Sequence, residues 1–306
     1  MTELVSVIIP NYNYGRYLKE AIDSVFGQSY PRCEIIVVDD GSTDESLDVL
    51  RSYGDRLRWV QQARQGVSAA RNRGIQESRG PFVALLDSDD VWHPEKLARQ
   101  LPALTRPSVG MVYCGRRLID GAGRWLQTQQ PRHSGWLLKD IALLRWAQAP
   151  GGSAALVRRA CFDRVGLFDA ALSTSADWDL WRRIACSYEI EVVPEPLVSY
   201  RQHGVAMHRN ADLFERDMLH AFSRMFEDPA AALIHPLRRQ CYSNLYVMLA
   251  GAYFQVGRWD HSLAYAWRSV LVWPRNMAAL ASFPLRGLGR FLGLDTPDLS
   301  SAIQRF

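Results

Sequence analysis

The chain has 306 residues, of which 48% are hydrophobic and 22% charged, and its formal net charge is +4. This is the composition of a globular protein with ample material for a core, which excludes a disordered or fibrous chain. The small positive charge does not indicate a nucleic-acid partner.

The cysteines and the hydropathy pattern bear on the cellular compartment. The five cysteines are scattered and show no C-x-x-C spacing. This argues against a disulfide framework and against a zinc site, and favours a reducing compartment. No basic region followed by an apolar run opens the chain, and no apolar run reaches the roughly 18 residues that span a bilayer. We therefore expect no signal peptide, no membrane-spanning helix and a cytoplasmic location.

The first part of the chain alternates between apolar runs and helical periodicity. Strands are predicted at 5–9, 33–38, 57–60 and 82–86, with helices at 18–25, 47–50 and 68–74. Pro10 is expected to end the first strand, because proline cannot donate a hydrogen bond within a central strand. Ser68 is expected to cap the third helix. The alternation predicts a parallel, Rossmann-like sheet with right-handed crossovers.

The rest of the chain is less regular. We predict strands at 111–114, 154–157, 190–193 and 197–200, the last two separated by Pro194 and Pro196, and helices at 137–147 and 177–185. Beyond about residue 211 only helices are expected. A boundary near 206–211 divides the chain into a domain at 1–208 and a helical region at 209–306.

The helical region contains a segment, 257–276, that resembles a single tetratricopeptide-like helix pair. One repeat cannot bury its own apolar face, so it should pack on the first domain or on another subunit. Residues 267–294 mix Trp, Phe and Leu with arginines. Core packing and contact with a membrane surface are both open for this stretch.

Three carboxylates follow the predicted strand at 82–86: Asp87, Asp89 and Asp90. Like charges this close persist at a strand end only if something positive lies among them. Ligands bind at the carboxyl edge of open α/β sheets, and oxygen ligands suit Mg²⁺ or Mn²⁺ holding a diphosphate. The alternative is a solvated acidic turn in which Asp90 caps the next helix.

Two earlier loops should reach the same edge. Asp39 and Asp40 end the second strand, where a carboxylate could accept from a base N–H or a ribose hydroxyl. The alternative is an Asp pair that only initiates a turn. Pro10, Tyr12 and Asn13 follow the first strand and would border a nucleotide, with Tyr12 able to stack on the base.

Five motifs in order resemble family 2 glycosyltransferases. They are Val-Ser-Val-Ile-Ile-Pro-Asn-Tyr-Asn at 5–13, Ile-Ile-Val-Val-Asp-Asp-Gly-Ser-Thr-Asp at 35–44, Gly-Val-Ser-Ala-Ala-Arg-Asn-x-Gly at 66–74, Leu-Asp-Ser-Asp-Asp at 86–90 and Asp-Trp-Asp-Leu-Trp at 177–181. The resemblance covers about residues 4–205 and implies an α/β fold of the GT-A type. In that fold, a mostly parallel, Rossmann-like sheet is flanked by helices. The small all-helical region that the sequence pattern predicts at 209–306 would follow it.

The resemblance also implies an activity. It is metal-assisted, inverting transfer of a sugar from a nucleoside-diphosphate sugar, with UDP, dTDP or GDP as the nucleotide, to a hydroxyl of a saccharide or lipid-linked acceptor. The process implied is bacterial cell-surface polysaccharide biosynthesis on the cytosolic side of the membrane. The protein could also contact the inner face of that membrane as a peripheral protein.

The same resemblance assigns roles to single residues. Asp40 contacts the base, and Asp87-Ser88-Asp89 is the D-x-D motif. In that motif Asp87 faces ribose or metal-bound water, and Asp89 ligates Mg²⁺ or Mn²⁺. His203, in Tyr-Arg-x-His at 200–203, is a further metal or phosphate ligand, or else a structural histidine.

Two further roles concern the transfer step. Arg71 lies one helical turn past Ser68 and could reach the diphosphate or the base, or it could simply be solvated. Asp177 matches the family's catalytic base, which takes the proton of the acceptor hydroxyl. The Glu that usually precedes this Asp is replaced by Ala176. This substitution leaves the acceptor class open.

The segment 115–159 is rich in arginine and contains Trp125, Trp136 and Trp146. Three readings of this segment are open. It could be a solvated face, a nucleic-acid surface, or a site for an acceptor that carries phosphate or lies at an anionic membrane.

Two rival functions also remain. One is a sugar nucleotidyltransferase, whose Gly-rich, basic first loop this chain lacks, and the other is a non-catalytic scaffold with the same fold.

Overall fold

The computed structural model of the chain describes residues 3–146, 149–203 and 210–277. They belong to two compact units: Met1–Trp136 with Gln148–Ala206, and Leu137–Ala147 with Met207–Phe306. The sequence prediction assigned 137–147 to the first domain. In the structure this segment joins the second unit, where the carbonyl of Leu143 accepts a hydrogen bond of 2.8 Å from the side chain of Asn244. Among the described residues, no helix is both long enough and apolar enough to cross a membrane.

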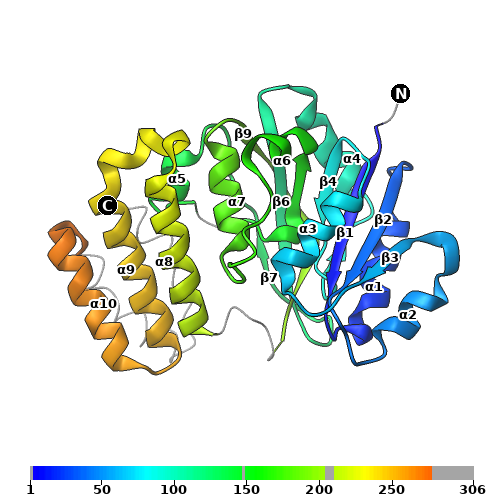
Figure 1. Ribbon diagram of the computed structural model, residues 1–306, viewed down its shortest axis with the longest axis horizontal. Coiled ribbons are helices and arrows are strands. Elements are labelled where there is room, and N and C mark those ends of the chain that lie inside the picture. The colour runs from blue at the N-terminus through cyan, green and yellow to red at the C-terminus, as the bar shows by residue number, and fades with distance from the viewer. Residues whose placement is uncertain (1–2, 147–148, 204–209, 278–306) are drawn as a thin grey trace. The chain divides into compact units, whose positions relative to one another are not determined.

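The first unit is built on one nine-stranded sheet in the order β3-β2-β1-β4-β8-β6-β9-β5, with β7 paired to β6. Figure 1 shows helices around this twisted sheet. The strands are β1 (Val5–Asn11), β2 (Cys33–Asp39), β3 (Arg58–Gln61), β4 (Phe82–Leu85), β5 (Val91–Trp92), β6 (Val109–Asp120), β7 (Trp125–Gln129), β8 (Ala155–Arg158) and β9 (Glu189–Gln202). The helices are α1 (Gly15–Phe26), α2 (Ser46–Ser52), α3 (Val67–Glu77), α4 (Lys96–Gln100), α6 (Arg159–Val165) and α7 (Ala176–Ala185), with a 3₁₀ turn at Gly152–Ala154.

The four N-terminal strands run parallel, which confirms the predicted β-α-β-α-β-α-β order. The prediction that Pro10 ends the first strand is wrong. Pro10 lies within β1, in register with Val38 of β2. The pairing of β1 with β4 ends at Ile8. The missing N–H of Pro10 therefore falls where β1 has no partner on that side, so no ladder hydrogen bond is lost.

Helices cover both faces of the parallel strands. Val7 and Ile9 belong to the same buried cluster as Leu18 of α1. Ile8, which alternates with them and so faces the other side, lies under Gly74 of α3. A Cβ built on Gly74 would approach the Ile8 side chain to 2.2 Å, so only glycine lets α3 lie this close to the sheet.

The second half of the sheet differs from the prediction. The strands expected at 190–193 and 197–200 form one strand, β9, which continues through Pro194 and Pro196. Partner strand β6 shifts register opposite this stretch. Strand β5 pairs with β9 only at Val198–Ser199. The two prolines therefore lie where one side of β9 is an edge, which is where proline is tolerated in a sheet.

The second unit is helical in its described part, as predicted. Its elements are α5 (Leu138–Ala142), α8 (Ala211–Glu227), the 3₁₀ segment Pro229–Leu237, α9 (Arg238–Gln255), α10 (Trp259–Val272) and a 3₁₀ turn at Pro274–Asn276. Helices α9 and α10 pack side by side (Figure 1). A buried polar network joins them, in which the Ser243 hydroxyl donates to the Ser269 carbonyl at 2.9 Å and Asn276 donates to Ser243 at 2.8 Å. Residues 278–294 of the predicted apolar stretch lie outside the described residues.

Candidate active site

The predicted residues on β1 and β2 lie together at the carboxyl ends of these strands. One carboxyl oxygen of Asp39 accepts from the Asn11 side chain at 3.0 Å, and the other accepts from the Ser42 N–H at 3.0 Å. The Ser42 hydroxyl accepts from the Asn13 N–H at 2.9 Å. Asp39 is fully buried. Its contacts shape the two loops, and its role in donor binding stays a prediction.

Asp40 is directed towards the start of α3. Its Oδ1 accepts from the Gln62 side chain and the Gln65 N–H, both at 2.8 Å, and its Oδ2 accepts from the Gly66 N–H at 2.7 Å. A carboxylate has about four lone-pair sites, so about one remains for a base N–H or a ribose hydroxyl. The loop that precedes α3 thus holds the Asp40 side chain in place beside the carboxyl end of β2.

The other predicted nucleotide contacts differ in accessibility. Tyr12 is partly exposed, and the Arg64 guanidinium lies 4.3 Å from the centre of its ring. One ring face is therefore covered by a cation, and a base would have to stack on the other face. Asn13 is exposed, whereas Pro10 and Ser88 are buried. A ligand thus has more direct access to Tyr12 and Asn13 than to Pro10 and Ser88.

Arg71 joins the predicted catalytic base, Asp177, to Asp87, which was predicted to contact the donor. Its Nη2 lies 2.8 Å from Asp87 and its Nη1 lies 2.8 Å from Asp177. The Arg71 side chain is only 5% exposed, so the reading as a solvated arginine is wrong. Burial opposes its charge, but Asp177 and Asp87 outweigh this effect and raise the pKa of Arg71. The charged guanidinium is therefore part of the site at any physiological pH.

Asp177 lies in the first turn of α7 and is held by both of its oxygens. Oδ1 accepts from Arg71, and Oδ2 accepts from the Gly152 N–H at 3.0 Å. Burial raises the pKa of Asp177 and the neighbouring Asp87 adds to this, although Arg71 opposes it. A carboxylate with a raised pKa in a fixed position has the properties of a general base.

Asp89 and His203 form the second pair in the site. The His203 Nε2 lies 2.9 Å from Asp89 Oδ2, and the buried His203 Nδ1 has no hydrogen-bond partner among the described residues. Burial and the charge of Asp87 raise the pKa of Asp89. The Tyr14 ring lies 5.4 Å from that of His203, and burial together with Asp89 raises the pKa of Tyr14 to about 12.

These residues fit a divalent cation only in part. The described residues hold no ready-made group of three or more His, Cys, Asp or Glu ligands. Asp89 Oδ2 and His203 Nε2 lie 2.9 Å apart, so both atoms could face one bound ion. Mg²⁺ in such sites is bound by one or two protein groups together with substrate phosphates. The pair therefore fits an ion that arrives with a diphosphate.

Asp90 does not cap the following helix, which corrects that alternative. Helix α4 begins after Glu95 and has no side-chain cap. Instead, Asp90 is buried and accepts from the Arg201 N–H at 2.9 Å. The Arg201 side chain donates to the Asp89 carbonyl at 2.8 Å and to Glu20 at 2.6 Å. These contacts fasten the end of β9, and with it His203, to the acidic loop.

The sequence prediction missed the role of the residues that flank Arg71. Ser68 does not cap α3, whose N-cap is Gly66 without a side-chain contact. Instead, the Ser68 hydroxyl donates to the Leu172 carbonyl at 2.6 Å. Asn72 forms two hydrogen bonds with the backbone of Phe168, at 2.8 and 2.9 Å. The motif at 66–74 was the available signal, but the partners are about 100 residues away in the sequence.

Ala176 is fully buried at the start of α7. The Glu that family members usually carry at this position would place a charged side chain in that buried environment.

The arginine-rich segment 115–159 does not form one surface, because residues 137–147 belong to the second unit. Trp125 and Trp136 are exposed, whereas Trp146 is buried.

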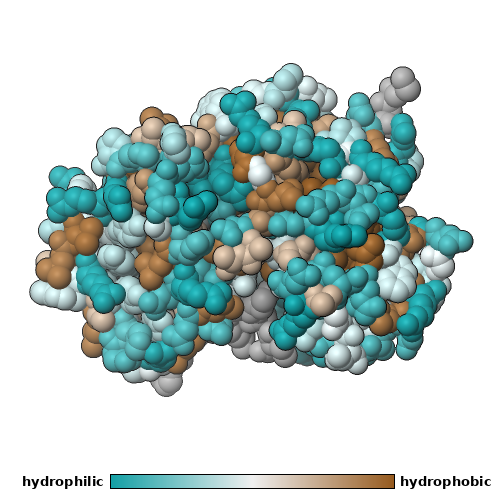
Figure 2. Space-filling view, in the orientation of Figure 1, coloured by the Kyte–Doolittle hydropathy of each residue, from teal (hydrophilic) through white to brown (hydrophobic). Residues whose placement is uncertain are grey.

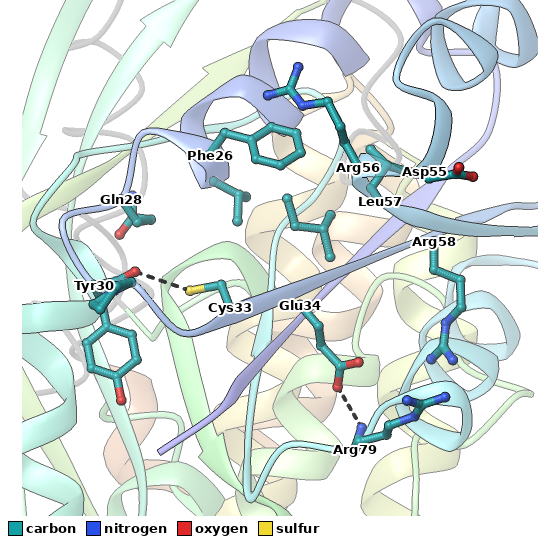
Figure 3. A pocket seen from close by; sticks show the side chains of 13 residues that line it. Phe26, Gln28, Tyr30, Cys33, Glu34, Asp55, Arg56, Leu57, Arg58 and Arg79 are labelled. Carbon is teal, nitrogen blue, oxygen red and sulfur yellow. Dashed lines mark hydrogen bonds between the residues drawn. The ribbon is translucent and has the colours of Figure 1, made fainter. Parts of the chain in front are cut away.

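A hollow of about 580 Å³ opens at the other end of β2. Figure 3 shows its lining, which includes Cys33 and Glu34 at the start of β2 and Arg56 and Arg58 near β3. Asp39 ends β2 and Cys33 begins it, and at about 3.3 Å per residue the hollow lies about 20 Å from the acidic loops. This hollow is therefore separate from the candidate site.

The chain is similar to known glycosyltransferases. Residues 6–166 match the sequence profile of "Glycosyl transferase family 2". The uncharacterized glycosyltransferase RP339 of Rickettsia prowazekii is 37% identical over 206 residues, which cover 66% of this chain and 64% of that protein. TuaG of Bacillus subtilis, whose name assigns it to teichuronic acid biosynthesis, is 39% identical over 120 residues, which cover 38% of this chain and 48% of TuaG. The chain therefore spans less than two thirds of the length of either protein.

Solved structures share the fold at low sequence identity. The mannosyltransferase PcManGT from Pyrobaculum calidifontis, in complex with GDP-Man and Mn²⁺, is 19% identical with a TM-score of 0.65, and the match covers 99% of this chain and 85% of that one. S. aureus TarS 1–349, in complex with UDP-GlcNAc, is 16% identical with a TM-score of 0.61, and the match covers 86% and 90%. These similarities concern the fold.

Proposed function

Because the chain belongs to glycosyltransferase family 2, we propose that it transfers a sugar from a nucleoside-diphosphate sugar to an acceptor hydroxyl, with inversion at the anomeric carbon. One observation carries this proposal. The buried Arg71 bridge brings Asp177 next to Asp87. Both lie near the start of α3, where the Gly66 N–H also holds Asp40.

The donor would lie along the carboxyl ends of β1, β2 and β4. Asp40 would accept from the base, Tyr12 would stack on it, and Asp87 would face the ribose. The similar structures with GDP-Man and with UDP-GlcNAc support a nucleotide sugar as the ligand class. We propose UDP as the first nucleotide to test, followed by GDP and dTDP.

Asp89 and His203 are the residues that would hold Mg²⁺ or Mn²⁺. When bound, such an ion stabilises the negative charge that develops on the leaving diphosphate. The 2.9 Å approach of His203 Nε2 to Asp89 Oδ2 supports this assignment, because it places two possible ligand atoms side by side. A bound cation would also offset the burial and the charge of Asp87, which raise the pKa of Asp89.

Asp177 would take the proton of the acceptor hydroxyl. Held by Arg71 and by the Gly152 N–H, it presents a carboxylate at a fixed position. The hydroxyl would attack the anomeric carbon on the face opposite the leaving diphosphate, and this geometry inverts the centre. General-base catalysis of this kind contributes about 10²–10⁴-fold in rate.

The acceptor is proposed to be a saccharide or lipid-linked intermediate of a bacterial surface polysaccharide, met at the inner face of the plasma membrane. The name of TuaG supports the process. An apolar stripe on α10, formed by Trp259, Leu263, Trp267 and Leu271, supports the location, because each of these side chains is more than half exposed. Figure 2 shows hydrophobic side chains over this helix. Residues four apart lie along one side of a helix, as in helices that bind membrane surfaces.

The membrane contact can be tested with vesicles. Full-length protein should sediment with vesicles that contain anionic phosphatidylglycerol, and the double substitution Leu263→Ser with Trp267→Ser should reduce the bound fraction. A wild-type protein that stays in the supernatant at low salt would refute the contact without touching the proposed chemistry.

A donor screen tests the proposed activity. The protein is incubated with Mn²⁺ and separate nucleotide sugars, and release of the nucleoside diphosphate and thermal shift are measured. A glycosyltransferase should select one donor, and Asp177→Asn should still bind it but lose turnover. A nucleotidyltransferase would instead form the nucleotide sugar from a nucleoside triphosphate and a sugar phosphate, and a scaffold would show neither reaction.

A further inference from the structure

We propose that Asn72 of α3 is a positioning residue that orients Asp177 for the transfer step, although it touches neither Asp177 nor the proposed donor site. The inference rests on the proposed function, because it takes Asp177 as the base. Its physical basis is a clamp between one face of α3 and the irregular segment 166–175, which leads into α7.

The clamp has three points on α3. Ser68, Arg71 and Asn72 are three and four residues apart, so their side chains lie on one face of the helix. Ser68 binds the Leu172 carbonyl, Arg71 binds Asp177, and Asn72 binds Phe168. Three side chains on one face of α3 thus hold three points between Phe168 and Asp177.

Asn72 makes the most specific of these contacts. Its Nδ2 donates to the Phe168 carbonyl at 2.8 Å, and its Oδ1 accepts from the Phe168 N–H at 2.9 Å. An amide side chain is the group that can donate and accept at one backbone residue at once. Asp could keep only the acceptor, and an aliphatic residue could keep neither contact.

Phe168 passes this constraint to the site. It is buried, and the Arg71 guanidinium lies 5.3 Å from the centre of its ring. The Phe168 ring also meets the ring of Trp181 of α7 edge-on at 6.4 Å. A shift of Phe168 would therefore displace both the cation that holds Asp177 and the helix that bears it.

The segment is held from the other side by α7 itself. Arg183 donates to the Val165 carbonyl at 2.7 Å and to the Leu167 carbonyl at 2.8 Å, and it pairs with Asp179 at 2.8 Å. Because Gly74 lets α3 lie close to the sheet, Asn72 connects a helix packed on the sheet to the segment before Asp177. The remaining contacts would keep the segment folded when Asn72 is changed.

The first experiment separates binding from turnover. The variants are Asn72→Leu, which keeps the branching at Cγ but is larger and forms no hydrogen bonds, and Asn72→Asp, which keeps the acceptor. The matched control is Gln76→Ala, which changes an exposed residue one helical turn further along α3. Because a misplacement of about 1 Å can cost about 100-fold in rate, we expect kcat to fall roughly 10–100-fold in Asn72→Leu and less in Asn72→Asp. The Kd of the donor selected by the screen, measured with Mn²⁺, should stay within about twofold.

The second experiment asks whether Asn72 acts through Asp177. Asn72→Leu is combined with Asp177→Asn, and residual diphosphate release is measured at high enzyme concentration. If the inference is right, the Asn72 substitution adds no further loss in the Asp177→Asn background, because residues that act as a unit are not additive. Should Asn72→Leu lower the residual rate by its full factor, or weaken donor binding in proportion, Asn72 is not a positioning residue for Asp177.

The failure of the proposed function would look different. In that case wild-type protein releases no diphosphate from any donor, or Asp177→Asn retains full transfer. If Asn72→Leu melts before the assay temperature, Asn72→Asp decides the question with the same two measurements.

Discussion

Replacing Arg71 by Met removes the cation between Asp87 and Asp177 while keeping most of the side-chain volume. The two ion pairs are each 2.8 Å long, and the side chains of Asp87 and Asp177 are 28% and 23% exposed. Removing one partner of a buried pair costs about 3–5 kcal/mol. Because both carboxylates keep some contact with water, we expect Arg71→Met to lower the free energy of unfolding by about 3 kcal/mol at pH 8, the lower end of this range.

The loss should depend on pH with a definite sign. Burial already raises the pKa of Asp177 in the wild-type protein, and without Arg71 this pKa rises further. Between the unfolded pKa of about 3.9 and the raised folded pKa, the folded protein binds more protons than the unfolded chain. Stability therefore falls as pH rises through this window. Arg71→Met should be destabilised less at pH 5 than at pH 8.

Denaturant unfolding at both pH values measures this effect. The matched control is Arg73→Met on the same helix, whose pair with Glu77 is 2.7 Å long but whose side chain is 53% exposed. Such surface pairs contribute about 0.3–0.5 kcal/mol. The reasoning is refuted if Arg71→Met costs no more than Arg73→Met, or if it is destabilised more at pH 5 than at pH 8.

Three other perturbations have defined outcomes. Asp89→Ala should abolish the Mn²⁺-dependent thermal shift with donor, and a variant that keeps it would exclude Asp89 as a ligand. A Cβ on Gly152 would lie 2.9 Å from Arg71 Nη2, so Gly152→Ala should displace Arg71 and lower kcat. The control is Gly151→Ala, whose Cβ would meet no atom closer than 4.0 Å and should leave kcat unchanged. Equal kcat values for the two variants would contradict the predicted displacement of Arg71. Burial lowers the pKa of Lys96 to about 8. At this residue the unfolded chain then binds more protons from pH 8 to about 10.4, so the stability of the wild-type protein relative to Lys96→Met should rise over this range. A stability difference that stays constant with pH would contradict a lowered pKa of Lys96.

Local pattern was enough to locate the parallel strands and the loops that end them. Apolar runs such as Val5–Ile9 and Phe82–Leu86 can be buried on both faces only in a covered sheet, so their order predicts the fold. Local pattern was not enough where a strand's course depends on how its neighbouring strands pair with it. Pro194 and Pro196 read as strand breakers because the sequence does not show that β5 leaves that part of β9 unpaired.

The sequence by itself determined which carboxylates stand at the ends of strands, because hydrophobic periodicity and the acids that interrupt it are local properties. Only the tertiary structure decided what each of them touches. Arg71 and Asp177 are 106 positions apart, and no local rule pairs them. Their contact exists because Gly74 lets α3 lie against the sheet, and because Ser68 and Asn72 hold the segment that carries Asp177 against α3.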